Sequence, residues 1–204
     1  NVVDVTNYIL HAFGQPLHAF DLTAIPQQHI IVKNLPQETS FVTLDEVERK
    51  LHREDLMICN QETGMCIAGV FGGLDSGVTE KTTDIFLESA YFDPVSIRKT
   101  ARRHALHTDA SFRFERGTDP NQVVYALKLA ALLIKDIAGG SISSELIDVY
   151  TQPVKPKKID LSLQKMNALV GKEIEEETIL SILDALEIEV LSKDKDNLYL
   201  SVPT

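Results

Sequence analysis

The chain has 204 residues, of which 44% are hydrophobic and 25% are charged. These proportions are typical of a globular protein with a packed core, and they exclude a disordered or fibrous chain. The formal net charge of −10 argues against a protein that coats nucleic acid without sequence preference. No apolar run reaches the roughly 18 residues of a membrane span, and no secretory signal is visible.

The first half of the chain predicts mainly short strands. Residues 2–6 are mostly β-branched and predict a short strand or turn, and residues 7–13 predict a brief helix that ends at Gly14. Strand-sized apolar runs then alternate with Gly, Pro, Asn and charged residues, at 30–32, 41–44, 56–59, 66–70 and 84–87. This alternation predicts a multi-stranded sheet.

Two helices are expected next. Asp93 and Pro94 have the residue types of an N-cap and a first helical position, and this helix should run to about Arg103. Asp119 and Pro120 predict the start of a longer helix, which should stop at residues 139–140. Its apolar residues recur three and four positions apart, so we interpret them as core rather than as a cofactor surface.

A segment rich in Pro and Lys, residues 152–158, predicts a domain boundary between 1–152 and 153–204. Beyond it, Ser162 can cap a helix that ends at Gly171, Glu175–Glu177 suit the first turn of another helix, and a strand pattern follows. The expected fold class is therefore α+β, with mixed or barrel-like sheets and flanking helices, followed by a small truncated helical domain. We expect a piece of a longer protein.

The chemistry-bearing residues leave several alternatives open. Cys59 and Cys66 lack the spacing of a zinc or disulfide motif, so no metal site is expected and a reducing cytoplasm is the expected location. Residues 95–117 carry six basic and two acidic side chains, which suit either a phosphate backbone or a solvated helix face.

The glycine-rich segment 68–77 matches neither a P-loop nor a dinucleotide fingerprint. It would let the backbone approach a ligand closely, or it would form a tight turn. Glu88 follows a buried-strand pattern, which leaves a structural ion pair and a ligand-binding acid equally open. His18 lies in an apolar stretch, where a structural hydrogen-bonded histidine is the usual case. The residues alone indicate an α/β or α+β domain with a glycine-lined pocket.

Four strings carry a resemblance: VVDVTNYILHAFGQPLHAFDL, IAGVFGG, FLESAYFDP and RRHALHTDASFRFERGTDP. They resemble, in the same order, the editing module of the bacterial phenylalanyl-tRNA synthetase beta subunit, over about residues 1–150. The string KKIDLSLQKMNALVGKEI resembles the start of the next domain of that subunit, a small helical fold related to DNA-binding modules.

The resemblance implies that the chain hydrolyses tyrosyl-tRNA(Phe) and contacts the tRNA, in support of phenylalanine–tRNA ligation by the whole enzyme. The implied partners are tRNA(Phe) and the alpha subunit, in a heterotetramer of two alpha and two beta subunits. No cofactor is implied for this part; ATP and Mg²⁺ belong to other regions, and no amino-acid activation is expected from this chain alone. The alternative is a non-catalytic, tRNA-contacting scaffold, and a free-standing hydrolase is disfavoured by the second domain.

The site residues implied by the resemblance fall into three groups. His18, Asn7 and Thr108 are expected in catalysis; Glu88, Gly72, Gly69, Ala68, Pro16 and Ala110 are expected to bind substrate; Arg102 and Arg103 are expected to contact tRNA. A buried acceptor such as Glu88, with a backbone N–H donor from the glycine segment, is satisfied by a phenol and left unpaired by a phenyl ring. The hydrolytic base stays open between His18 and a water held by substrate and backbone.

Overall fold

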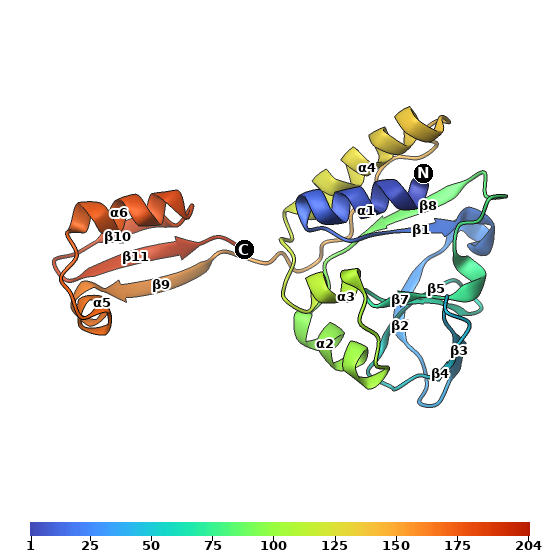
Figure 1. Cartoon of the computed structure of the whole chain (residues 1–204), viewed down its shortest axis with the longest axis horizontal. Coiled ribbons are helices and arrows are strands. Elements are labelled where there is room, and N and C mark those ends of the chain that lie inside the picture. The colour runs from blue at the N-terminus through green and yellow to red at the C-terminus, as the bar shows by residue number, and fades with distance from the viewer. The chain divides into compact units, whose positions relative to one another are not determined.

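The computed structural model describes residues 1–204 and divides them into two compact units, Asn1–Asp148 and Val149–Thr204 (Figure 1). The division falls in the irregular stretch that follows the longest helix, a few residues before the predicted linker. Each unit has its own buried core. No helix of the chain is both long and apolar enough to cross a membrane.

Helix α1 (Val2–Phe13) opens the first unit, so the strand or turn predicted for residues 2–6 is wrong. Val5 and Ile9 are both buried one helical turn apart, and burying this face outweighs the weak helix propensity of the β-branched residues. Gly14 ends the helix as predicted: its φ is 71°, in the left-handed region, and its N–H donates to the Leu10 carbonyl.

Strands β1 (Leu17–Asp21) and β8 (Ile85–Ser89) form a two-stranded antiparallel ribbon. Helix α1 and helix α4 (Gln122–Ala138) lie side by side on one face of this ribbon (Figure 1). Their buried residues, including Val5 and Ala126, pack against Leu17 and Leu87. Helix α4 begins at Gln122, slightly later than the Asp119–Pro120 signal suggested, and ends before Gly139 as expected.

A second sheet has four antiparallel strands in the order β2-β5-β6-β7. These strands are β2 (Ile31–Asn34), β5 (Leu56–Cys59), β6 (Gly64–Ile67) and β7 (Phe71–Gly72); β3 (Ser40–Val42) pairs with β4 (Glu48–Lys50) in a small hairpin. Short 3-10 helices complete the loops at Leu22–Ala24, Pro26–Gln28 and Leu74–Ser76. The fold is mixed α+β as expected, but none of its sheets closes into a barrel.

The larger core lies between the four-stranded sheet, the other face of the β1–β8 ribbon and two helices, α2 (Pro94–Arg103) and α3 (Asp109–Phe114). Helix α2 starts as predicted, because the Asp93 side chain accepts a 2.7 Å hydrogen bond from the Ser96 N–H. Helix α3 was not predicted. It buries Phe114 against Phe92, with the two rings edge to face at 4.9 Å.

The second unit contains a three-stranded antiparallel sheet in the order β10-β11-β9 and two helices. Its elements are β9 (Lys157–Ser162), α5 (Leu163–Val170), α6 (Glu176–Ala185), β10 (Glu189–Lys193) and β11 (Asn197–Val202). Both helices and the last strand were predicted, including the Ser162 cap and the left-handed Gly171. Two strands were missed, so this unit is a sheet with helices rather than the helical module expected.

Candidate active site

His18 and Glu88 occupy directly opposite positions on β1 and β8. Opposite residues of an antiparallel pair project from the same face, with Cβ atoms about 5 Å apart. On this face the neighbouring pair, Phe20 and Phe86, packs into the larger core. His18 and Glu88 therefore project toward the four-stranded sheet, away from α1 and α4.

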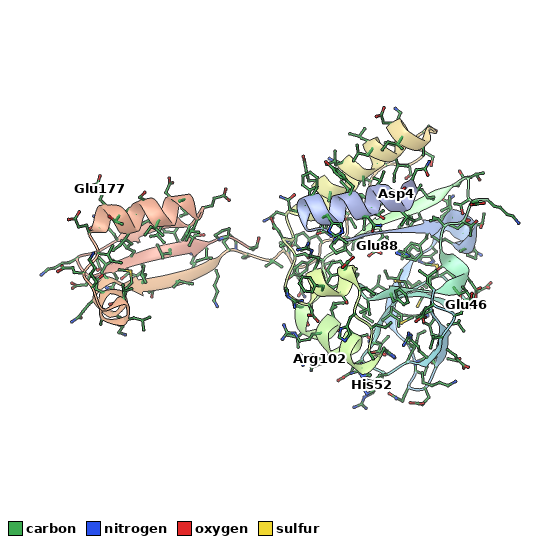
Figure 2. The ribbon with its side chains drawn as sticks, in the orientation of Figure 1. Asp4, Glu46, His52, Glu88, Arg102 and Glu177 are labelled. Carbon is green, nitrogen blue, oxygen red and sulfur yellow. The ribbon has the colours of Figure 1, made fainter.

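Glu88 is half-buried on β8, and its carboxylate forms no hydrogen bond or ion pair with any protein group. Burial raises its pKa from 4.5 to about 7, because a low-dielectric surrounding disfavours the charged form. In Figure 2, Glu88 lies in the interior of the first unit. A buried acceptor without a partner is costly for stability, and such groups cluster at functional sites.

His18 is half-buried on β1, and one of its two ring nitrogens is buried without a partner. Its Nε2 has no hydrogen-bond partner in the protein. Burial lowers the pKa of His18 from 6.5 to about 4, so the ring is neutral at pH 7. The ring packs edge to face on Phe20, with the centroids 4.4 Å apart, which fixes its plane beside Glu88.

Gly72 on β7 touches the His18 ring from the opposite sheet. A Cβ at this position would lie 3.1 Å from His18 Cε1 and 2.8 Å from Leu44 Cδ1. Gly69 has a φ of +67°, and a Cβ there would lie within 3.0 Å of side chains of the core behind the sheet. Gly72 therefore forms a wall beside His18, whereas Gly69 allows the turn and the close packing behind that wall.

The glycine segment was also expected to supply a backbone N–H donor to the substrate. The Ala68 N–H donates to the Leu56 carbonyl, the Val70 N–H to Ile67 and the Gly73 N–H to Met65. These three donors are thus used within the sheet and its turn. Ala68 itself is buried in the core.

Thr108 connects helix α3 to the glycine segment. Its hydroxyl donates a 2.8 Å hydrogen bond to the Val70 carbonyl and accepts one of 3.0 Å from the Ser111 N–H. The only proton of the Thr108 hydroxyl is therefore donated to Val70, and its oxygen caps the start of α3. Thr108 is better suited to positioning this helix than to transferring a proton. Ala110, two residues further along the chain, packs against the larger core.

Asn7 and Pro16 lie at the periphery of this arrangement. Asn7 is exposed on α1, the helix that covers the other face of the ribbon, so the structure does not bring its side chain together with His18 and Glu88. Pro16 is buried immediately before β1. The Nε2 of the preceding Gln15 donates a 2.8 Å hydrogen bond to the Ala90 carbonyl, and its Oε1 is buried without a partner; no motif in the sequence singled out this residue.

Arg102 and Arg103 differ in their surroundings despite being adjacent. Arg102 is exposed on α2, at the periphery of the unit in Figure 2. Arg103 forms ion pairs with buried Asp55 and with Glu54, the latter at 3.1 Å. Asp55 also accepts a 2.6 Å hydrogen bond from His104 Nε2 and one of 3.0 Å from Thr100. Arg103 thus joins α2 to the start of β5, and its guanidinium is already engaged.

His18 and Glu88 are neighbouring side chains with unpaired polar atoms, and together they can recognise a ligand that both donates and accepts hydrogen bonds. The neutral imidazole can hold a water or an ester oxygen, and the carboxylate can accept from a hydroxyl. No group of three or more His, Cys, Asp or Glu side chains in the structure is arranged to hold a metal ion.

Comparison with known proteins gives consistent results. A family profile described as the B3/4 domain matches residues 1–139. The phenylalanine–tRNA ligase beta subunits of Bacteroides thetaiotaomicron and Porphyromonas gingivalis are 63% and 56% identical to this chain over 203 and 204 residues. Both alignments cover all of this chain and 25% of the relative, so the chain spans about a quarter of the length of the curated relatives it matches.

Among solved structures, an N-terminal fragment of the phenylalanyl-tRNA synthetase beta subunit from Pyrococcus horikoshii aligns with a TM-score of 0.48 at 16% identity. That alignment covers 99% of this chain and 59% of the fragment.

Proposed function

Because this chain belongs to the B3/4 domain family, in the form that occurs in phenylalanine–tRNA ligase beta subunits, we propose that it removes tyrosine wrongly attached to tRNA(Phe). The reaction is hydrolysis of the aminoacyl ester. The observation that supports it best is the in-register pair of His18, whose Nε2 is buried without a partner, and Glu88, whose carboxylate has no partner in the protein.

Glu88 supplies the discrimination between the two amino acids. Tyrosine differs from phenylalanine by one hydroxyl, which can donate to the Glu88 carboxylate in the interior of the domain. A phenyl ring placed there leaves the carboxylate desolvated and unpaired. Sites built to bind a substrate hydroxyl reject the analogue that lacks it strongly, because their own polar groups are then left unsatisfied.

His18 acts at the ester end of the substrate in this proposal. With a pKa of about 4 the ring is neutral at pH 7, so its unpaired nitrogen can accept a hydrogen bond from the attacking water. Gly72 gives the substrate room beside the ring. Ala68, Gly69, Pro16 and Ala110 shape the walls, and Thr108 keeps the start of α3 against the glycine segment.

The wider assignment follows from the relatives. We infer that the chain works in the cytoplasm within a complex with an alpha subunit, as a heterotetramer of two alpha and two beta subunits, and that tRNA(Phe) is the macromolecular substrate. ATP and Mg²⁺ would serve the ligation reaction in regions outside this chain. Among the basic residues of α2, exposed Arg102 suits contact with tRNA better than Arg103 does.

Deacylation by the complete synthetase tests this proposal. Purified enzyme is mixed with tyrosyl-tRNA(Phe) in the absence of ATP and tyrosine, and the release of tyrosine is followed. The wild type should accelerate release, and His18→Ala should slow it by about 10- to 100-fold, the range expected for loss of a water-positioning group. Release at the uncatalysed rate by a folded wild-type enzyme would favour the non-catalytic scaffold instead.

A further inference from the structure

Helix α3 presents one large apolar side chain to solvent. Phe112 is 48% exposed, whereas Ser111 and Phe114 of the same helix are buried. A single exposed apolar residue is common on protein surfaces, so exposure alone does not mark a site. The groups that surround this ring distinguish it from the other exposed apolar residues.

Two arginines lie beside the Phe112 ring. The guanidinium carbon of Arg116 is 3.5 Å from the ring centroid, and that of Arg113 is 5.8 Å from it. Both distances lie within the range of a cation–π interaction, about 6 Å. Arg116 Nη1 donates to the Phe112 carbonyl at 2.9 Å and to the Glu115 carboxylate at 2.7 Å, which fixes the guanidinium over the ring. One face of the ring is therefore covered, while nearly half of the residue stays open to solvent.

Positive charges outnumber carboxylates around Phe112. Arg116 is paired with Glu115, but Arg113 forms no ion pair. Arg98 on α2 donates only to the main-chain carbonyl of Glu115, at 2.9 Å. An aromatic ring stacked with a guanidinium, next to cations that can meet phosphates, is typical of surfaces that bind single-stranded nucleic acid.

Helix α3 connects this surface to the candidate active site. The Thr108 hydroxyl at its start donates to the Val70 carbonyl, two residues before Gly72, which lies beside the His18 ring. Phe112 follows one helical turn later, and its N–H donates to the Thr108 carbonyl at 2.9 Å. An aminoacyl ester is attached to the ribose at the 3′ end of its RNA. An ester held at His18 therefore brings the last nucleotides of the RNA to the surface around the site, of which α3 is a part.

We propose that Phe112 and Arg116 form a stacking platform for an unpaired nucleobase near the 3′ end of the tRNA, and that Arg98 and Arg113 contact the adjoining phosphates. This inference rests on the proposed editing function, which brings an aminoacylated RNA end to the domain. Because every base has an aromatic face, the platform binds without reading the sequence. It contributes to the affinity for RNA and not to the choice between tyrosine and phenylalanine.

Stacking on position 112 can be measured with a single fluorophore. The chain contains no tryptophan, so Phe112→Trp introduces one indole and keeps an aromatic surface. The 204-residue variant is titrated at low salt with tetraadenylate and, in parallel, with an abasic oligoribonucleotide that carries the same number of phosphates. We expect tetraadenylate to quench the indole fluorescence and the abasic oligonucleotide to leave it unchanged, because only the first offers a base.

Phe13→Trp is the matched control. Phe13 is also an exposed phenylalanine on a helix, but it packs edge to face on Tyr125, with the ring centroids 5.7 Å apart, and no arginine covers its ring. We expect no quenching in this variant, and circular dichroism establishes that both variants are folded. Equal quenching of the two variants, equal quenching by the two oligonucleotides, or no quenching of Phe112→Trp would overturn the inference.

The second readout is kcat/KM for deacylation of tyrosyl-tRNA(Phe) by the complete synthetase. Phe112→Ala should lower it by about tenfold, the effect of losing one base stack, whereas Phe112→Tyr keeps the aromatic face and should retain the wild-type value. Phe13→Ala should also retain it. The ratio of tyrosyl- to phenylalanyl-tRNA(Phe) deacylation should be the same in all variants. A wild-type kcat/KM in Phe112→Ala would contradict the inference.

Two further outcomes separate this inference from its alternatives. A wild type that does not deacylate would overturn the editing function, while the fluorescence titration would still decide whether position 112 stacks a base. If Phe112→Ala no longer copurifies with the alpha subunit and Phe112→Trp does not respond to RNA, the surface is a protein interface and the inference is wrong.

Discussion

His18 and Glu88 face one another across two antiparallel strands, and burial moves their pKa values in opposite directions, to about 4 and about 7. Between these pH values the histidine has lost its proton and the glutamic acid has kept its own. Both groups are then neutral in the folded chain. Above pH 7 the carboxylate alone becomes charged, without a partner in the protein, and the site is ready for a hydroxyl donor.

Glu88→Gln should therefore stabilise the chain at high pH. The pKa of Glu88 is higher in the folded state than its ordinary value of 4.5, so the folded state retains a proton that the unfolded state releases between pH 4.5 and 7. Stability falls as the pH rises through this window, by up to about 3 kcal/mol. Urea unfolding at pH 4.5 and pH 8 should show similar stabilities for variant and wild type at the lower pH, and a variant more stable by roughly 1–3 kcal/mol at the higher. Exposed Glu80→Gln is the control; a stability difference for Glu88→Gln that does not change with pH would contradict this account.

The preference for tyrosine should depend on pH in the same region. Ionised Glu88 strongly penalises a phenyl ring, whereas protonated Glu88 does so less. The ratio of tyrosyl to phenylalanyl ester hydrolysis by the complete enzyme should rise between pH 6 and pH 8, with a midpoint near the Glu88 pKa of about 7. Taking the ratio cancels the hydroxide dependence common to both esters. Glu88→Gln should give a flat ratio, and a flat ratio in the wild type would show that Glu88 ionisation plays no part.

Gly72→Ala should reduce deacylation more than it reduces stability. The added Cβ meets Leu44 Cδ1, the mobile end of an exposed side chain, but it also lies 3.1 Å from the half-buried ring of His18. Displacing that ring by a few tenths of an ångström should slow hydrolysis by at least about tenfold. Gly77→Ala is a matched control, because its Cβ would meet Leu44 at 3.3 Å and not His18. Equal deacylation rates for the two variants would show that Gly72 does not contribute to the site.

Substitutions of the two adjacent arginines of α2 should have different effects, one on stability and the other on RNA binding. Arg103→Ala leaves the buried Asp55 carboxylate with fewer partners and should cost about 2–4 kcal/mol in urea unfolding. Arg102→Ala should change stability little, because Arg102 is exposed, but it should weaken tRNA(Phe) binding and reduce the salt dependence of the binding constant. An unchanged salt dependence for Arg102→Ala would indicate that this face of α2 contacts solvent and not tRNA.

Local signals predicted the ends of elements well. Asp93 with Pro94, Gly14, Ser162 and Gly171 mark helix boundaries in the structure as they do in the sequence, because capping depends on a few neighbouring residues. The first turns of α1 were misjudged, since Val2–Val5 favour strand locally and become helical through packing on the ribbon. Strand β9 of the second unit was missed because it begins within a lysine-rich stretch that resembles a linker.

Local sequence patterns predicted the site less well than they predicted the fold. Sequence reasoning left His18 and Glu88 each with a structural alternative, and only the register of two strands 70 positions apart brings them together. The resemblance supplied the candidate residues, yet it did not distinguish Arg103, held by Asp55, from exposed Arg102.

The central claim, that Glu88 reads the tyrosyl hydroxyl, is tested most directly by deacylation of tyrosyl- and phenylalanyl-tRNA(Phe) with the complete synthetase carrying Glu88→Ala, after its folding has been verified. The substitution removes both the acceptor for the hydroxyl and the buried charge that penalises phenylalanine. A hydrogen bond to a charged group contributes about 1.5–3 kcal/mol, so the account predicts a 10- to 100-fold fall in the ratio of the two rates. A Glu88→Ala enzyme that keeps the full wild-type preference for tyrosine would contradict it and would make Glu88 a structural residue.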